Sequence, residues 1–218
     1  MRLIAWASIS LFLLMVACKQ QLATSSLPYY NTPDFTPVFL NGMAAVEKTI
    51  DHTIGSFALN DQEGRAISSK DLKGKIHVAN FFFTGCGSIC PGMMNKMAIL
   101  NHEFEDDSSV VFLSFTVTPW RDSVPRLKEY ANVNKFIAPN WHLLTGPKSA
   151  IYNLARRSYF AEEALGFTKD STDFLHTEHI LLVDKTGRIR GIYNGTLALD
   201  MEQLGKDIRD LKLEDVLE

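Results

Sequence analysis

Two cysteines separated by three residues are the clearest chemical feature of the sequence. Cys86 and Cys90 follow the strongly apolar run 76–83, and Pro91 comes directly after them. Such a run predicts a central strand buried on both faces, and proline is favoured in the first turn of a helix. The pair therefore lies between the carboxyl end of a strand and the start of a helix, where open α/β sheets place their sites.

The position of Cys86 and Cys90 sets the chemistry that they can perform. A helix start lowers the pKa of a thiol, so we expect both residues to favour the thiolate. Two thiolates at this spacing can share a metal ion or form a Cys86–Cys90 disulfide. A purely structural disulfide is the plainer explanation, but closing so short a loop gains little chain entropy. A dithiol reductant is the other alternative, although such enzymes usually have two residues between their cysteines.

A histidine segment stands where redox enzymes of the thioredoxin-like class carry a proline. That proline precedes the strand facing the cysteines, whereas the last proline in this chain is Pro147. The matching stretch, 173–179, contains His176 and His179 instead. An imidazole and two thiolates form a soft site suited to copper, either Cu(I) or tetragonal Cu(II) with an added oxygen ligand. Zinc is also chemically compatible with these donors.

The remaining candidate ligands have plainer explanations. His179 points away from His176 if the strand has already begun there, so it stays an alternative ligand. Thioether ligands for Cu(I) are conceivable after the cysteine loop, but the helical spacing of those methionines favours core packing. The methionines are Met93, Met94 and Met97. The other histidines show no spacing that links them to the cysteines, and they are His52, His77, His102 and His142.

The N-terminus carries a targeting signal. Arg2 precedes the apolar run 3–17, which ends at Cys18 and is shorter than the roughly 20 residues that span a bilayer. This pattern resembles a bacterial lipoprotein signal over residues 1–18, cleaved so that Cys18 carries lipid, although Met15 replaces the usual leucine. An ordinary secretory signal or an uncleaved anchor is the alternative. In each case the rest of the chain works outside the cytoplasm, and residues 19–50 are expected to be a tether.

Residues 51–218 have the length and pattern of one α/β domain. The chain has 218 residues, of which 46% are hydrophobic, enough for a sizeable core. The formal charge is −3 with no basic cluster, which argues against nucleic acid as a partner.

The expected elements are a hairpin at 57–67, strands at 76–83, 110–117 and 141–144, helices after Pro91 and at 122–131 and 148–158, a hairpin at 179–193 and a final helix from Asp200. This order predicts a thioredoxin-like fold, a central mixed sheet flanked by helices, with an N-terminal hairpin extension.

Four motifs together resemble the Sco/SenC family of copper-binding proteins that serve cytochrome c oxidase assembly. They are residues 83–91, 117–122, 144–146 and 182–187, and the resemblance covers about residues 50–215. It implies that Cys86, Cys90 and His176 are the copper ligands, since the family histidine falls eleven residues before Gly187. It also matches Asp122 to a family aspartate near the copper loop, which orients a ligand or docks a partner. Helix N-capping is the plainer role for Asp122.

The resemblance implies a copper metallochaperone. It would deliver copper to a membrane oxidase, at the dinuclear copper centre in the second subunit of cytochrome c oxidase. It would act from a lipid-anchored position on the extracytoplasmic side of a bacterial membrane, with another copper chaperone or a thiol reductant as a further partner. The alternative is an enzyme, a thiol-disulfide oxidoreductase that reduces the cysteines of the acceptor. His176 separates the two, because copper binding needs it and simple dithiol exchange does not.

Overall fold

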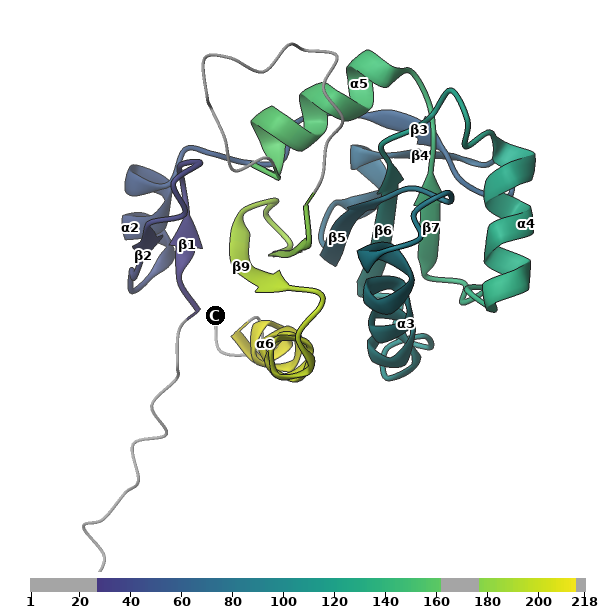
Figure 1. Cartoon of the computed structure of the whole chain (residues 1–218). Coiled ribbons are helices and arrows are strands. Elements are labelled where there is room, and N and C mark those ends of the chain that lie inside the picture. Colours follow the sequence, from purple (N-terminus) through teal and green to yellow (C-terminus); the bar gives the residue numbers. More distant parts are fainter. Residues whose placement is uncertain (1–26, 162–176, 215–218) are drawn as a thin grey trace, which may run out of the picture.

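The computed structural model describes residues 27–161 and 177–214. Within them, a mixed sheet has the strand order β2-β1-β9-β8-β5-β6-β7, and β3 pairs with β4 as a separate hairpin (Figure 1). The strands of the sheet are β1 (Tyr29–Tyr30), β2 (Pro37–Val38), β5 (Ile76–Phe82), β6 (Val110–Thr116), β7 (Trp141–Leu144), β8 (His179–Val183) and β9 (Ile189–Asn194). The hairpin strands are β3 (Ala58–Asn60) and β4 (Ala66–Ser68). This architecture confirms the predicted α/β class.

The centre of the sheet follows from its apolar runs. Every residue of β5 and β6 is buried, as expected of strands covered on both faces. They pair in parallel from Ile76↔Val110 to Phe82↔Thr116, while β8 runs antiparallel along the other edge of β5. The parallel pair brings the carboxyl ends of β5 and β6 together, and the loops that follow them meet at that end of the sheet.

Helices cover both faces of the sheet. The helices are α2 (Met43–Thr49), α3 (Ile89–His102), α4 (Val124–Asn134), α5 (Lys148–Asn153) and α6 (Ala198–Glu214), with a 3-10 turn η1 (Ser69–Leu72) and a π-helical turn η2 (Leu154–Ser158). The apolar sides of α3, α4 and α6 share one core with the sheet, and α3 lies beside α6 (Figure 1). The other core contains α5 and η2. None of the described helices has the length and apolarity to cross a membrane.

The segment expected to be a tether is folded from Leu27 onward. Tyr30 pairs with Ile189, which adds β1 and β2 to the sheet edge. Tyr29 packs with Val46 and Ile50 in a small core of its own. The tether predicted for 19–50 therefore does not extend over residues 27–50. Strands of two residues carry too little periodicity to be recognised in a sequence.

Arg190 in β9 fastens this N-terminal segment to the domain. Its guanidinium donates to the carbonyls of Leu27 and Pro28 and lies 4.0 Å from the ring centroid of Tyr29. It is 3% exposed and also pairs with Asp184 and Glu214. One buried cation thus joins the start of the described chain, the β8–β9 turn and the last helix.

We expect Arg190→Ala to lower the free energy of unfolding by about 3–5 kcal/mol, because it leaves the buried carboxylate of Asp184 and the partly buried one of Glu214 without their cation. Arg209→Ala is the matched control: Arg209 pairs with Glu103 at the surface, both about half exposed, and its loss should cost less than about 1 kcal/mol. Urea denaturation of the two variants measures the difference. Equal losses would show that Arg190 does not fasten the segment.

Candidate metal centre

The cysteines lie on the connection between β5 and α3. The loop 83–88 leaves the end of β5, and the amide of Cys86 donates to the carbonyl of Phe83 at 3.2 Å. Cys90 is in the first turn of α3, and its amide donates to Sγ of Cys86 at 3.4 Å. Both cysteines are free thiols in the structure. The backbone therefore places the two sulfur-bearing residues against each other without a covalent bond.

The two thiols differ in exposure and in acidity. Burial raises the pKa of Cys86, but the Cys90 thiol and the amides of Cys90, Ser88 and Ile89 outweigh it, so this pKa is lowered. Burial and the neighbouring Cys86 raise the pKa of Cys90 to about 12. Cys90 is only 5% exposed. The expectation that the helix start lowers both pKa values is therefore wrong for Cys90, because desolvation exceeds the helix field there.

We expect Cys86 to react with iodoacetamide at least about a hundredfold faster than Cys90, since each pKa unit changes the thiolate fraction about tenfold. Mass spectrometry of the peptides after timed quenching at neutral pH gives both rates. The unfolded chain in urea is the control, in which the two rates should converge. Faster modification of Cys90 in the folded chain would contradict the assigned asymmetry.

A buried carboxylate holds the cysteine loop in place. Asp122 is 1% exposed and accepts hydrogen bonds from the amide of Thr84 at 3.2 Å and from its hydroxyl at 2.6 Å. The hydroxyls of Thr116 and Thr118 also donate to it. Asp122 therefore joins the loop that precedes Cys86 to the end of β6.

The capping role considered for Asp122 is absent from the structure. The N-cap position of α4 belongs to Ser123, and the Asp122 contacts described above run to the cysteine loop and to β6 instead. Arg126 adds a contact from α4 to the same loop, because its Nε donates to the Thr84 hydroxyl at 3.3 Å. Whether Asp122 acts on a bound metal through this loop stays a prediction.

We expect Asp122→Ala to cost about 2–4 kcal/mol of unfolding free energy, because it leaves buried threonine hydroxyls and an amide without an acceptor. The same change should speed alkylation of Cys90, because the loop 83–88 that precedes it would become more mobile. Asp106→Ala, at an exposed position, is the matched control and should change neither quantity. Unaltered Cys90 reactivity in a destabilised Asp122→Ala protein would confine Asp122 to a role in stability.

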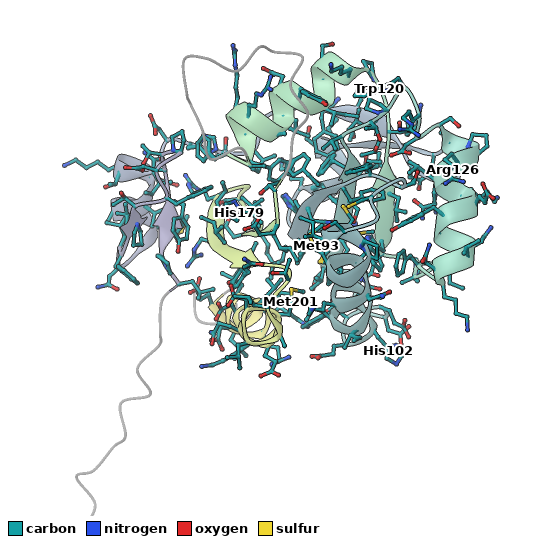
Figure 2. The ribbon with its side chains drawn as sticks, viewed as in Figure 1. Met93, His102, Trp120, Arg126, His179 and Met201 are labelled. Carbon is teal, nitrogen blue, oxygen red and sulfur yellow. The ribbon has the colours of Figure 1, made fainter. Side chains whose placement is uncertain are left out.

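Of the two candidate histidine ligands, only His179 belongs to the described residues. His176 lies outside the described residues. His179 begins β8, and its ring meets the edge of Phe35 with centroids 5.8 Å apart. The next residue, Ile180, packs in the α3 core with Cys90, whereas Leu181 packs in the core of the opposite face. Because side chains alternate along a strand, His179 lies on the same face of the sheet as Leu181, opposite the α3 core that contains Cys90. Figure 2 labels His179 in β8 and Met93 in α3.

The remaining histidines and methionines have structural roles. Met93, Met94 and Met97 are completely buried in the α3 core, and the Asn80 amide donates to the sulfur of Met94 at 3.4 Å. Core packing, the plainer explanation, is confirmed for them. The histidines without a link to the cysteines each have another neighbour: Ser158 for His52, Tyr159 for His77, Glu105 for His102 and Asp61 for His142.

One residue near the cysteines was missed in the sequence. Tyr130 of α4 packs against Phe82, with ring centroids 5.7 Å apart. Burial and the charges of Cys90 and Cys86 raise its pKa to about 12, so its hydroxyl stays protonated beside the thiols. The apolar spacing of α4 could have assigned this residue to the inner face, but only the fold brings α4 next to the cysteine loop.

The described residues contain no group of three or more histidine, cysteine, aspartate or glutamate side chains placed to hold a metal ion. Cys86 and Cys90 supply two soft donors at one point. Two thiolates suit a soft ion such as Cu(I), and no third histidine, cysteine, aspartate or glutamate joins them among the described residues.

A mixed sheet with a dithiol loop at the carboxyl end of its central parallel strand, followed by a helix, defines a thioredoxin-like protein. The SCO1/SenC family model matches residues 29–212. The chain therefore belongs to the SCO1/SenC family. The match begins at Tyr29, which agrees with the folded N-terminal segment seen in the structure.

Three solved structures are similar to this chain in sequence and in fold. A SCO1/SenC family lipoprotein from Bacillus anthracis is 28% identical with a TM-score of 0.64, over 75% of this chain and 96% of its own. BsSco, described as having a disulfide switch and as a member of the Sco family of cytochrome c oxidase assembly proteins, is 28% identical with a TM-score of 0.62, over 73% and 93%. ScoI of Bradyrhizobium japonicum with copper bound is 26% identical with a TM-score of 0.57, over 72% and 98%.

Proposed function

We propose that this protein is a copper metallochaperone that holds copper through Cys86, Cys90 and His176. The observation that carries the proposal is the contact between two free thiols of unlike acidity at the carboxyl end of β5. The copper-bound structure of the relative from Bradyrhizobium japonicum supports copper as the cargo. The description of BsSco supports a membrane oxidase as the acceptor, and we place delivery at the dinuclear copper centre of cytochrome c oxidase.

The different pKa values of the two thiols suggest how copper is taken up. Cys86 is partly exposed and its pKa is lowered, so it supplies the first thiolate. Cys90 is buried and protonated at neutral pH, so its proton must leave when the second sulfur binds. Uptake therefore becomes more favourable as pH rises. The Asp122 contacts keep the loop in one place, which spares binding the cost of ordering it.

His176 is the third ligand in this proposal. The chain that follows it is anchored near the cysteine helix, because the amide of Gly195 donates to the Glu178 carbonyl at 2.8 Å. A Cβ added at Gly195 would lie 2.7 Å from both Ile180 and Met93. β8 thus packs closely against the first turns of α3. Ile180, the residue of β8 at this contact, follows position 176 by four residues.

We expect His176→Ala to weaken copper binding by at least about tenfold, the value of one lost ligand, and to alter the thiolate-to-copper absorption band. His179→Ala should leave both nearly unchanged, because its ring faces the opposite side of the sheet. His102→Ala, at an exposed site on α3, serves as the neutral control. Competition titration and the visible spectrum give the readout, and loss of binding in His179→Ala with retention in His176→Ala would reverse the assignment.

A thiol-disulfide oxidoreductase is the second candidate function, and the thiol asymmetry favours it too. The Cys86 thiolate would attack an acceptor disulfide to form a mixed disulfide. Cys90 would then lose its proton and displace the second thiol, which leaves a Cys86–Cys90 disulfide. Two electrons pass to the acceptor, and an external thiol reductant must restore the pair. Efficient exchange indifferent to His176, together with weak copper binding, would favour this function over the metallochaperone.

We propose a lipid anchor at Cys18 that holds the protein on the extracytoplasmic side of a bacterial membrane. The solved relative from Bacillus anthracis is called a lipoprotein. We expect Cys18→Ser to move the protein from the membrane pellet to the soluble fraction, with copper binding unchanged. Membrane fractionation with a lipid-labelling assay tests this, and continued lipid attachment in Cys18→Ser would refute the anchor.

A further inference from the structure

An exposed tryptophan stands beside the cysteine loop. Trp120 lies on the turn between β6 and α4, and it is 57% exposed. The same turn carries Asp122, whose carboxylate accepts hydrogen bonds from Thr84 in the loop that leads to Cys86. Tryptophan is among the residues most enriched at the energetic centres of protein interfaces. An exposed indole next to the dithiol therefore points to contact with another protein.

Neighbouring side chains hold the Trp120 ring in place. The Nζ of Lys148 lies 5.0 Å from the centroid of this ring and 5.0 Å from that of the Tyr152 ring. A cation placed over an aromatic face is attracted to it. The Tyr152 hydroxyl in turn donates to the carbonyl of Val117 at 2.9 Å. The indole is thus positioned before a partner arrives, which lowers the entropic cost of binding.

Two arginines accompany the indole. Arg121 follows Trp120, is exposed, and forms no ion pair within the described residues. Arg126 donates through Nε to the Thr84 hydroxyl at 3.3 Å, and its guanidinium pairs with Glu129 at 3.1 Å. Both side chains of that pair are about half exposed or more, and such a pair is weak. Arg126 can therefore exchange Glu129 for a carboxylate of another protein.

These side chains form one cationic surface with an aromatic centre. We call it the Trp120 surface, and it consists of Trp120, Arg121, Arg126 and Lys148. It lies on a chain whose formal charge is −3, and Asp122 adds no exposed charge because it is 1% exposed. Figure 2 shows Trp120 and Arg126 on the side of the domain opposite β1 and β2. A surface of this kind complements an acidic segment that also carries an apolar side chain.

We propose that the Trp120 surface docks an acidic segment of the protein on which the Cys86–Cys90 pair acts. This rests on the proposed function only in that the pair acts on another protein, which both candidate functions require. The indole receives an apolar side chain, and the arginines pair with carboxylates that flank it. Because Arg126 contacts Thr84, two residues before Cys86, a segment held here lies close to the accessible thiol.

Three synthetic peptides test this surface through the reaction of Cys86. Each carries one leucine and a cysteine in a pyridyl disulfide, with flanking residues that are all glutamate, all glutamine or all lysine. The Cys86 thiolate forms a disulfide with the peptide sulfur, and the pyridyl sulfur leaves with the electron pair and takes up a proton. Absorbance of the released pyridinethione gives the rate. The full chain in neutral detergent carries Cys18→Ser, so that Cys86 and Cys90 are its only thiols.

At low salt this chain should react with the glutamate peptide at least about tenfold faster than with the lysine peptide. The ratio should approach one in about 1 M salt, where the Debye length falls to about 3 Å. Arg121→Glu/Arg126→Glu should reverse the order of the peptides. Arg121→Glu alone should lower the ratio at least about threefold, and it measures the same effect if the double variant does not fold.

Lys70→Glu/Lys73→Glu is the matched control. It makes the same change of charge at two exposed lysines that precede β5, whereas the cysteines follow that strand, so the peptide ratio should persist. The iodoacetamide rate of each variant corrects for changes in the Cys86 thiolate itself. After this correction, Trp120→Ala should slow all three peptides at least about fivefold, because each carries the same leucine.

A glutamate preference that Arg121→Glu/Arg126→Glu retains, or that Lys70→Glu/Lys73→Glu loses to the same extent, would overturn the Trp120 surface. The absence of any preference would overturn it as well. Unchanged rates in Trp120→Ala would overturn the anchoring role of the indole. The assay uses no copper, so a failure of copper binding through His176 and a failure of this surface are seen separately.

Discussion

The site depends on one buried carboxylate, Asp122, which accepts hydrogen bonds from Thr84, Thr116 and Thr118. A carboxylate removed from water is tolerated only when its oxygens are satisfied, and here the donors come from two separate segments. The cysteine loop therefore cannot move away from the end of β6 without taking both Thr84 donors from that carboxylate. The position of Cys86 is set by this constraint together with its own amide contact to Phe83.

Packing against the sheet then makes the two cysteines differ in burial and in pKa. Cys90 enters the core shared by α3, α4 and α6, whereas Cys86 stays at the rim. Burial raises the pKa of Cys90, whereas the Cys90 thiol and nearby amides lower the pKa of Cys86. The same division suits two kinds of chemistry, uptake of a soft ion and exchange with a disulfide, because both begin at the accessible thiolate. The choice between them rests on whether a third ligand joins the pair.

Long apolar runs made most of the fold predictable. The strands β5, β6 and β7 and the last hairpin lie within a residue or so of their expected bounds. The fold of residues 27–50 could not be predicted, because their strands are too short to show a hydrophobic period. In addition, the hydrogen bonds that fix Leu27 and Pro28 come from Arg190, some 160 positions later. His179 lies on the face of the sheet opposite Cys90, but its expected facing relative to His176 stays a prediction. The acidity of Cys90 and the partners of Asp122 did not follow, since both arise from contacts between segments that local sequence does not connect.

The most direct test of the metal site is X-ray absorption at the copper edge of the copper-loaded protein. The account predicts two sulfur neighbours at about 2.3 Å, by analogy with zinc–thiolate bonds, and at least one nitrogen neighbour from an imidazole. Loss of the nitrogen signal in His176→Ala would complete the assignment. A single sulfur neighbour, or a first shell made only of nitrogen and oxygen, would contradict a copper centre built on Cys86 and Cys90.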